Sequence, residues 1–251
     1  MDSERGGRIV SLRAAGHELL AEVDAAASMS GGSFPMAPWA GRIRRGRFSF
    51  GGDRQMPINL PPHAIHGTVL DRSWTVVDDT TARCAFDDPW PFAGSIIARW
   101  ELRAGSLHQT LEVRADEPMP VSMGWHPWFR RRLSGVEAEL DWSPGHMFER
   151  DGDGMPSGRL VDVPPGPWDD CFGGLAGPPV LRWPGVLELE IASTCGFVVV
   201  YDEPADTICV EPQTAPPDAL NLTDDRHRAA VVEPGEPLVA TTTWTWRRLD
   251  G

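Results

Sequence analysis

The sequence contains no lysine: all 23 of its basic residues are arginine, against 36 acidic residues. We attribute the missing lysine to the codon bias of a G+C-rich genome and not to function. The formal net charge is −13 and the sequence pI is about 4.9. Nucleic acids and anionic membranes both require a basic face on the protein that binds them. The charge therefore argues against either of them as the main partner.

Long apolar runs are absent as well. No stretch of about 18 apolar residues, the length needed to cross a bilayer, occurs in the chain. Residues 1–5 lack the apolar segment of a signal peptide. The four cysteines show no CxxC pair and no metal-ligand spacing. These features predict a cytoplasmic protein with reduced cysteines. The cysteines are Cys84, Cys171, Cys195 and Cys209.

Glycine and proline, by contrast, are abundant, with 26 and 24 residues spread along the 251-residue chain. Such frequent breaks leave little room for long helices and favour many short strands. Residues 104–106 (Ala-Gly-Ser) predict a hairpin turn between two strand-like runs. One segment, Gly16–Ala27, is compatible either with a helix or with two strands and a turn. Alternation and β-branched or aromatic enrichment predict strands at Arg8–Leu12, Arg47–Phe50, Ser73–Asp78, Ser95–Arg103, Leu107–Arg114, Pro120–Trp125, Glu137–Trp142, Val186–Ile191, Phe197–Tyr201, Thr207–Val210 and Leu238–Trp246.

The length suits one large domain, and all-β domains often reach it. It is ample for a sizeable core. We find no internal repeat and no low-complexity tail. Asp151–Gly154 is similar to the start of a calcium loop, but no bidentate Glu follows at the required spacing. We therefore predict a surface turn there.

Three segments carry residues suited to proton transfer. Glu211 follows an apolar strand-like run, Gly196–Val210, and precedes a proline-stiffened turn. Burial at such a position can raise the pKa of the carboxyl towards working pH and suit it to general base catalysis. The other two segments, Pro62–Gly67 and Gly124–Phe129, are each built around a histidine. A carboxylate with imidazoles and neighbouring tryptophans suits a sugar substrate.

These three segments, in this order, resemble those of the aldose 1-epimerase (galactose mutarotase) family. Two more segments match, Pro38–Ile43 with the following Gly46 and Phe48, and Trp168–Phe172. The resemblance implies an all-β fold, one large antiparallel β-sandwich of the galactose mutarotase type over residues 1–251. It also implies an isomerase that interconverts the α and β anomers of an aldose, its small-molecule partner, without a metal or organic cofactor.

Ring opening of a cyclic aldose takes a proton from the C1 hydroxyl and delivers one to the ring oxygen. The resemblance implies that Glu211 is the base and His126 the acid. Apolar neighbours such as Trp125 and Trp128 would lower the pKa of His126 and make it a ready donor. From the residues alone, Glu211 could instead form a structural ion pair with an arginine. His126 could likewise belong to a packed aromatic corner.

The same resemblance implies that His66, Arg42 and Asp169 bind the substrate. Strand neighbours point to opposite faces, so only one of Asp169 and the adjacent Asp170 should face the site. His63 and His66 form an HxxH motif, which is a weak metal signal because no acidic or cysteine ligand is nearby. We expect these two histidines to point apart.

Two neighbouring features bear on the choice of substrate. Arg44, Arg45 and Arg47 form either a solvated strand edge or a phosphate pocket, which would make a hexose 6-phosphate the substrate. Gly41 stands where many family members have Asn, so one hydrogen bond to the sugar would be missing. Asp218 lies in the Glu211 segment, where we predict that its carboxylate caps local backbone N–H groups in a turn.

Other readings of the chain stay open. One is a non-catalytic carbohydrate-binding protein on the same fold; the presence of Glu211, His126 and His66 together argues against it, because binding needs no acid or base. Another is a carbohydrate enzyme of a different reaction type, although no carboxylate pair with the separation of about 5–10 Å found in glycosidases is evident. Gly6–Leu12 resembles the second strand of the family, and the exposed edge before it predicts a covering loop or a homodimer.

Overall fold

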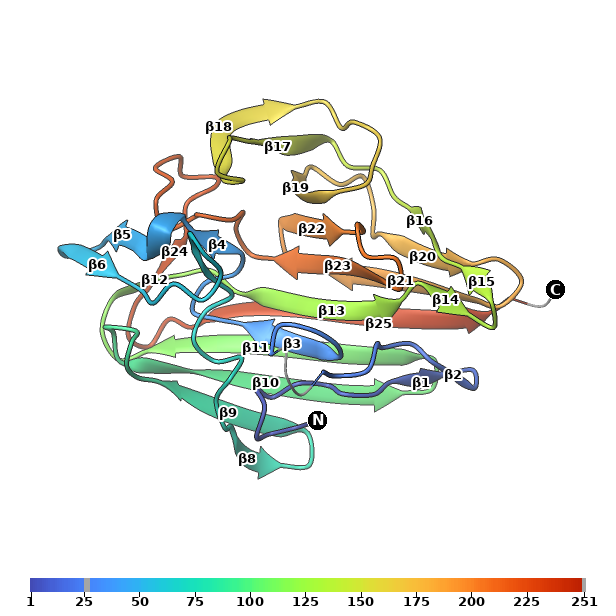
Figure 1. The fold of residues 1–251 in the computed structure, drawn as a ribbon. Coiled ribbons are helices and arrows are strands. Elements are labelled where there is room, and N and C mark those ends of the chain that lie inside the picture. The colour runs from blue at the N-terminus through green and yellow to red at the C-terminus, as the bar shows by residue number, and fades with distance from the viewer. Residues whose placement is uncertain (25–27, 250–251) are drawn as a thin grey trace.

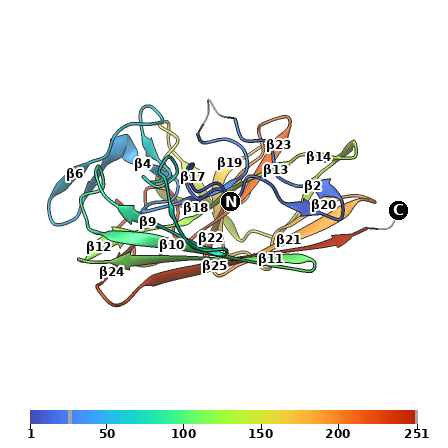
Figure 2. The same cartoon turned by 90° about the horizontal axis from the view of Figure 1, so that it is seen from below.

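The computed structural model describes residues 1–24 and 28–249, and its architecture is all-β (Figure 1). Two antiparallel sheets, of eight and seven strands, form the layers of a sandwich (Figures 1 and 2). The described residues contain no α-helix, only the 3₁₀ turn η1 (Arg44–Gly46). Accordingly, no helix in this part of the chain is long and apolar enough to span a membrane. The antiparallel β-sandwich expected from the sequence is confirmed.

The eight-stranded sheet is built around the long hairpin of β10 (Gly94–Arg103) and β11 (Ser106–Ala115), and β25 (Leu238–Arg248) pairs with β11. Its strands, in spatial order, are β16 (Glu139–Asp141), β20 (Val180–Trp183), β21 (Leu187–Ser193), β25, β11, β10, β9 (Thr81–Phe86) and β8 (Thr75–Asp78).

The seven-stranded sheet brings together segments that are far apart in the sequence. Its strands, in spatial order, are β18 (Pro156–Val161), β17 (His146–Arg150), β19 (Asp169–Gly173), β22 (Phe197–Tyr201), β23 (Thr207–Gln213), β13 (Gly124–Arg130) and β3 (Ser33–Met36). Five short strand pairs complete the fold: β1 (Arg13–Ala14) with β2 (His17–Glu18), β4 (Arg42–Ile43) with β7 (Ala64–Ile65), β5 (Arg47–Ser49) with β6 (Asp53–Gln55), β12 (Met119–Val121) with β24 (Ala230–Val232), and β14 (Arg132–Leu133) with β15 (Val136–Glu137).

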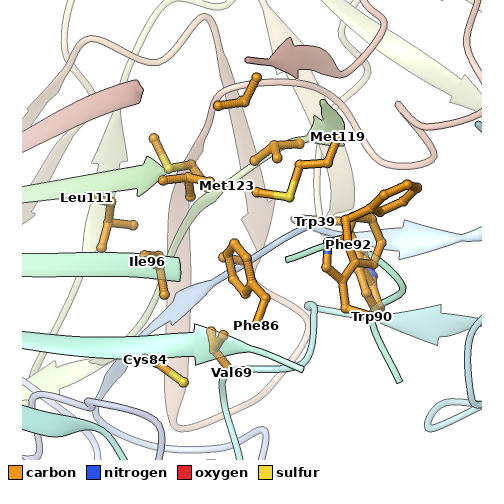
Figure 3. Packing of buried hydrophobic residues seen from close by; sticks show 14 of the residues in the cluster. Trp39, Val69, Cys84, Phe86, Trp90, Phe92, Ile96, Leu111, Met119 and Met123 are labelled. Carbon is orange, nitrogen blue, oxygen red and sulfur yellow. The ribbon is translucent and has the colours of Figure 1, made fainter. Parts of the chain in front are cut away.

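The alternation of side chains gives the seven-stranded sheet two different faces. One face packs against the eight-stranded sheet, where Phe172, Val200 and Val210 meet residues such as Leu189 and Trp244 in a common core. A second apolar cluster lies towards the other end of the sandwich, around the labelled aromatic and methionine side chains in Figure 3. The opposite face of the seven-stranded sheet is therefore free to carry polar groups.

Most strand predictions are confirmed, with shifts of one to three residues at the ends. The predicted 104–106 turn joins β10 to β11, with Arg103 paired to Ser106. Two predictions are wrong in detail: Pro120–Trp125 is divided between β12 and β13, and Glu137–Trp142 between β15 and β16. Arg8–Leu12 is not a strand, because its backbone makes only isolated bridges.

The N-terminal segment covers the outer edge of the seven-stranded sheet. Ile9 exchanges two backbone hydrogen bonds of 2.8 Å with Ser33 of the edge strand β3. The segment expected to leave an exposed edge thus itself covers the edge of β3, while the homodimer stays a prediction. The helix alternative for Gly16–Ala27 is wrong for residues 16–24, which contain no helix and include β2, the second strand of a small hairpin with β1. Residues 25–27 of that segment lie outside the described residues.

Candidate active site

One row of side chains crosses five strands of the seven-stranded sheet, on the face turned away from the core. In spatial order the row contains Cys171, Val199, Glu211, His126 and Phe34. Because side chains alternate along a strand, residues two positions away share this face. The adjacent row therefore holds Asp169, Tyr201, Cys209 and Trp128.

A cavity of about 590 Å³ opens over these rows. This volume lies in the range of small-molecule sites. The members of these rows other than Phe34 and Cys209 form its floor, together with Gln213. Its walls come from elsewhere in the chain: residues 28–30, the region around Gly41 and Arg42, the β7 end with Ile65 and His66, and the β17–β18 hairpin. All five residues that the sequence nominates, Glu211, His126, His66, Arg42 and Asp169, line this cavity.

Glu211 and His126 form a buried carboxyl–imidazole pair on the floor of the cavity. The Nε2 atom of His126 lies 3.4 Å from Oε1 of Glu211, and the two residues are 5% and 2% exposed. The imidazole is held between two aromatic rings, stacked on Phe34 with centroids 4.9 Å apart and on Trp128 at 5.1 Å. This packing fixes the plane of the ring and leaves its Nε2 edge directed at the carboxyl.

Burial shifts both groups of this pair towards their neutral forms. It raises the pKa of Glu211 well above 4.5, and the charge of Asp169 adds to the effect. It lowers the pKa of His126 to about 3, with a further contribution from the charge of Arg8. Charged forms lose solvation in a buried site, which explains both directions. Burial therefore favours the neutral form of the pair, a protonated carboxyl on Glu211 beside an unprotonated imidazole on His126.

His66 approaches His126 from a different part of the fold. The centroids of the two imidazoles are 4.9 Å apart and the rings are nearly perpendicular. Burial, followed by the proximity of His126 and Arg42, lowers the pKa of His66 well below 6.5, so its ring is neutral. His66 has a φ of +61°, a conformation that few non-glycine residues adopt. The next position, 67, requires glycine, because a Cβ there would lie 1.8 Å from the carbonyl oxygen of Ala37.

Arg42 and Asp169 meet at the rim of the cavity in an ion pair of 3.0 Å. Arg150 of β17 contacts the same carboxylate at 3.1 Å through Nη1 and the Asp170 carboxylate at 2.8 Å through Nε. Both aspartates line the cavity. The expectation that only one of them would face the site is therefore wrong. Asp170 lies at the start of β19, where Arg150 draws its carboxylate to the same side as that of Asp169.

Arg8 supports one wall of the cavity from below. Its guanidinium is buried and donates hydrogen bonds to the carbonyl oxygens of Ser28, Ser30 and Gly31. It also lies over the ring of Phe34, 4.5 Å from the centroid. Arg8 thereby links the loop at residues 28–31 to the aromatic stack that holds His126.

Several groups around the nominated residues have structural roles. Nδ1 of His63 accepts a hydrogen bond from the backbone N–H of Arg45, and Nε2 lies 2.9 Å from the carbonyl oxygen of Asp153. His63 does not line the cavity, so the two histidines of the HxxH motif point apart as expected. Asp218 caps a backbone N–H, but that N–H belongs to the distant Arg44 and not to its own turn. The prediction of a local cap is wrong in this respect.

The arginine cluster does not form a phosphate pocket at this site. Arg44 pairs with Asp151 at 2.7 Å, and Arg45 pairs with Asp153 at 3.3 Å. Arg47 donates to the side chain of Gln55. None of the three arginines lines the cavity. This arrangement favours the alternative of a solvated edge, and it shows the 151–154 segment as a surface turn that engages these arginines.

Sequence reasoning missed Gln213, Arg150, Arg8, Phe34 and Cys209. Gln213 donates a hydrogen bond of 3.3 Å to Oε2 of Glu211. Gln213 and Cys209 each lie two residues from Glu211, so strand alternation could have placed both on its face. Arg8, Phe34 and Arg150 reach the site through tertiary packing, and no local pattern signals them.

The fold and the site define a galactose mutarotase-like β-sandwich, and the sequence comparison agrees. A profile of the family described as aldose 1-epimerase matches residues 3–171, about two thirds of the chain. The chain therefore belongs to the aldose 1-epimerase family. Glu211 lies beyond the matched residues, so its place in the site rests on the structure. No curated protein matches the sequence.

Solved structures with the same fold cover nearly the whole chain. A candidate aldose 1-epimerase from Escherichia coli K12 matches with a TM-score of 0.83 and 18% identity, over 98% of this chain and 94% of that one. A galactose mutarotase-like protein from Clostridium acetobutylicum gives 0.82 and 19%, over 98% and 91%. Galactose 1-epimerase from Lactobacillus acidophilus gives 0.78 and 18%, over 98% and 90%. At these identities the likeness establishes the fold.

Proposed function

We propose that this protein is an aldose 1-epimerase that interconverts the anomers of a free hexose, with Glu211 and His126 as the proton-transferring pair. The observation that carries this proposal is their arrangement: a carboxyl and an imidazole 3.4 Å apart, both buried, on the floor of one cavity. Mutarotation needs one group that accepts a proton and another that donates one, within reach of the same C1–O5 bond.

In the direction that the family resemblance implies, the Glu211 carboxylate takes the proton of the C1 hydroxyl. The Nε2–H of His126 protonates the ring oxygen as the C1–O5 bond breaks, which leaves an open-chain aldehyde. Rotation about C1–C2 exposes the other face of the carbonyl. The ring oxygen then attacks that face, returns its proton to His126, and C1 receives its hydroxyl proton from Glu211.

The proton count of the pair fits this cycle. Ring opening converts an ionised pair, carboxylate and imidazolium, into a neutral pair, carboxylic acid and imidazole. The neutral pair is the form that burial favours, through the raised pKa of Glu211 and the lowered pKa of His126. Burial thus lowers the energy of the protonation state that follows ring opening, and ring closure regenerates the ionised state.

The rest of the cavity supplies groups that suit sugar hydroxyls. Arg42 and Asp169 offer a donor and an acceptor at the rim. Within the described residues, the Nδ1 atom of His66, Nε1 of Trp128 and Oε1 of Gln213 are buried without a hydrogen-bond partner. Buried polar atoms are normally paired, so hydroxyl groups of a bound hexose would satisfy them. The indole of Trp128 also offers an apolar surface for the C–H face of the sugar.

The backbone conformation at position 41 explains why glycine can stand where many family members have Asn. Its φ of +66° is left-handed, and a Cβ there would lie 3.0 Å from the ring of Pro217. Asn tolerates this conformation better than most residues and Gly tolerates it without strain. The substitution therefore preserves the backbone that leads to Arg42 and removes one side-chain contact with the substrate.

The test is anomer exchange measured by NMR saturation transfer on α-D-glucose, α-D-galactose and glucose 6-phosphate. We expect the wild-type protein to accelerate exchange of a free hexose. Glu211→Gln should lower kcat by at least about 100-fold, within the range of general acid–base catalysis, with little change in KM. Glu190→Gln, which changes an exposed carboxylate on the other sheet, is the matched control and should behave as wild type.

Three results would contradict the proposal. An unchanged kcat in Glu211→Gln would remove Glu211 from the chemistry. Saturable sugar binding without acceleration of any of the three sugars would favour a carbohydrate-binding protein. Acceleration of glucose 6-phosphate alone would replace the free hexose by a phosphorylated one as the substrate.

A further inference from the structure

The seven-stranded sheet brings a nitrogen, a sulfur and an oxygen ligand together beneath the cavity. The side chains of His126, Cys209 and Glu211 each offer one such atom, and these atoms all lie within 4.8 Å of one another. Cys209 precedes Glu211 by two residues on β23, so both point to the same face. On the adjacent strand β13, His126 lies opposite Glu211, and Trp128 pairs with Cys209.

We propose that His126, Cys209 and Glu211 form an inhibitory site for a zinc ion, which would occupy the lone pairs that the proposed proton transfer needs. The site is distinct in purpose from a catalytic metal centre, because the acid–base cycle described above proceeds without a metal. The claim of inhibition rests on the proposed function, whereas the claim of zinc binding stands on the ligand geometry alone.

The separations suit tetrahedral coordination. Zinc–nitrogen and zinc–oxygen bonds of about 2.0–2.2 Å place two ligand atoms roughly 3.3–3.5 Å apart at a tetrahedral angle. Nε2 of His126 and Oε1 of Glu211 are already 3.4 Å apart. A zinc–sulfur bond of about 2.3 Å requires the sulfur to lie roughly 3.5 Å from each of them. The three ligand atoms lie within 4.8 Å of one another, so Sγ of Cys209 has to move by roughly 1 Å to reach the required distance.

The chemistry of the three ligands selects the ion. A thiolate and an imidazole favour zinc and cobalt, whereas magnesium and calcium prefer sites made of oxygen atoms. A divalent ion with one thiolate, one carboxylate and a neutral imidazole carries no net charge. This neutrality limits the cost of placing the ion in a buried position. Coordination displaces the proton of the Cys209 thiol and any proton on Glu211, and both leave to solvent.

The ion has an entry path and an open fourth position. His126 and Glu211 line the cavity, whereas Cys209 lies beneath it and is fully buried. An ion entering through the cavity therefore meets the imidazole and the carboxyl first. Its fourth position faces the cavity, where it would be taken by a water molecule. Three protein ligands and one exchangeable position are the usual arrangement of accessible zinc sites.

The experiment uses cobalt as a spectroscopic probe and zinc as its competitor. We expect the wild-type protein to bind one equivalent of Co²⁺ with a thiolate-to-cobalt charge-transfer band, which one equivalent of Zn²⁺ displaces. Cys209→Ser should lose the band and bind zinc at least about 100-fold more weakly, since loss of even an outer-shell partner costs 10–100-fold. Cys209→Ala is the second variant, and circular dichroism establishes that both variants fold.

Cys171→Ser is the matched control. Cys171 is also a buried thiol on the same face of the sheet, but Val199 lies between it and Glu211 in the row. This variant should retain the band and the zinc affinity of the wild type. A band that persists in Cys209→Ser, or a wild-type protein without saturable binding of either ion, would overturn the proposal.

A separate measurement tests inhibition. Zinc should slow hexose exchange by the wild-type protein, in competition with sugar, and should leave folded Cys209→Ser unaffected at the same concentration. Equal inhibition of the two proteins would refute the assignment of Cys209. If no sugar is exchanged by the protein at all, the proposed function fails, and the cobalt band still decides whether the zinc site exists.

Discussion

His126 and Glu211 face each other across two adjacent strands, β13 and β23, and their reactive atoms lie 3.4 Å apart. Groups this close titrate as a unit, so the pKa values seen in kinetics belong to the pair and not to either residue alone. The active form holds one proton. A second proton removes the base, and loss of the last proton removes the acid.

This proton count predicts the pH dependence of anomer exchange. On the acid side, activity should fall as His126 takes up a proton, and its pKa of about 3 places this limb near pH 3. On the alkaline side, activity should fall as the pair loses its proton at the pKa of Glu211, which burial raises well above 4.5. NMR exchange rates from pH 3 to 9, corrected for spontaneous exchange, give both limbs. An acid limb near pH 6.5, typical of an exposed histidine, would contradict the buried pair.

Glu211 should cost stability at neutral pH. In the unfolded chain its carboxyl ionises freely above about pH 4.5, whereas in the folded protein burial raises its pKa and opposes ionisation. The unfolded state is thereby favoured as the pH rises from 4.5 towards the folded pKa. Glu211→Gln should therefore raise the free energy of unfolding and Tm at pH 7.

The sign of this effect gives an internal control. At pH 4 and below, the carboxyl is largely protonated in both states, so the gain from Glu211→Gln should disappear. Thermal unfolding of wild type and variant at pH 4 and pH 7, with Glu190→Gln beside them, provides the comparison. A stabilisation that is equal at both pH values would assign the gain to packing and not to the raised pKa.

Arg8 should affect the pH at which activity falls on the acid side without contacting the sugar. Its charge contributes to the low pKa of His126, and its guanidinium holds the loop at residues 28–31. Arg8→Met removes the charge, so the pKa of His126 should rise and the acid limb should move to higher pH. Arg8→Lys keeps the charge but not the planar fork, so it should loosen the loop and raise KM while leaving the limb in place. Equal movement of the limb in both variants would assign the effect to the loop.

Local patterns were sufficient to predict many of the strands, whereas the β-sandwich itself was predicted from the family resemblance. The alternation in Phe197–Tyr201 and Leu238–Trp246, and the turn at residues 104–106, predict elements that the structure contains. Where predictions failed, packing decided the outcome. Arg8–Leu12 has the composition of a strand, yet it forms only isolated bridges, Arg8 with Asp2 and Ile9 with Ser33 of β3. The buried Arg8 side chain donates to loop carbonyls. No pattern of neighbouring residues reports such a contact.

The residues of the site likewise fall into those that the sequence could nominate and those that only tertiary packing reveals. Glu211 and His126 could be nominated because each stands in a segment resembling the family, and strand alternation extends the nomination to their neighbours at two-residue spacing. The zinc ligand set could not be found from spacing, since Cys209 and His126 are 83 positions apart by number and meet only through the pairing of β13 with β23. Likewise, the sequence of the arginine cluster is compatible with a phosphate site, but in the structure Asp151 and Asp153 pair with two of these arginines.

Gln213 should position the carboxyl of Glu211 and control the alkaline limb. Its side-chain amide donates to Oε2 of Glu211, and this hydrogen bond lowers the pKa of the carboxyl against the effect of burial. Gln213→Met is close in size and removes the donor, so the pKa of Glu211 should rise further and the alkaline limb should move to higher pH. The acid limb, at which the pair takes up its second proton, should stay in place because the amide of Gln213 donates to Glu211 and not to the imidazole of His126. We expect kcat to fall by about 10-fold as the carboxyl loses its orientation, the effect of roughly one hydrogen bond to a charged group.

Gln213→Glu presents a second carboxyl and should move the same limb to still higher pH. A loss of kcat in Gln213→Met with both limbs unmoved would show that the amide acts on the substrate through its unpaired Oε1 and not on Glu211.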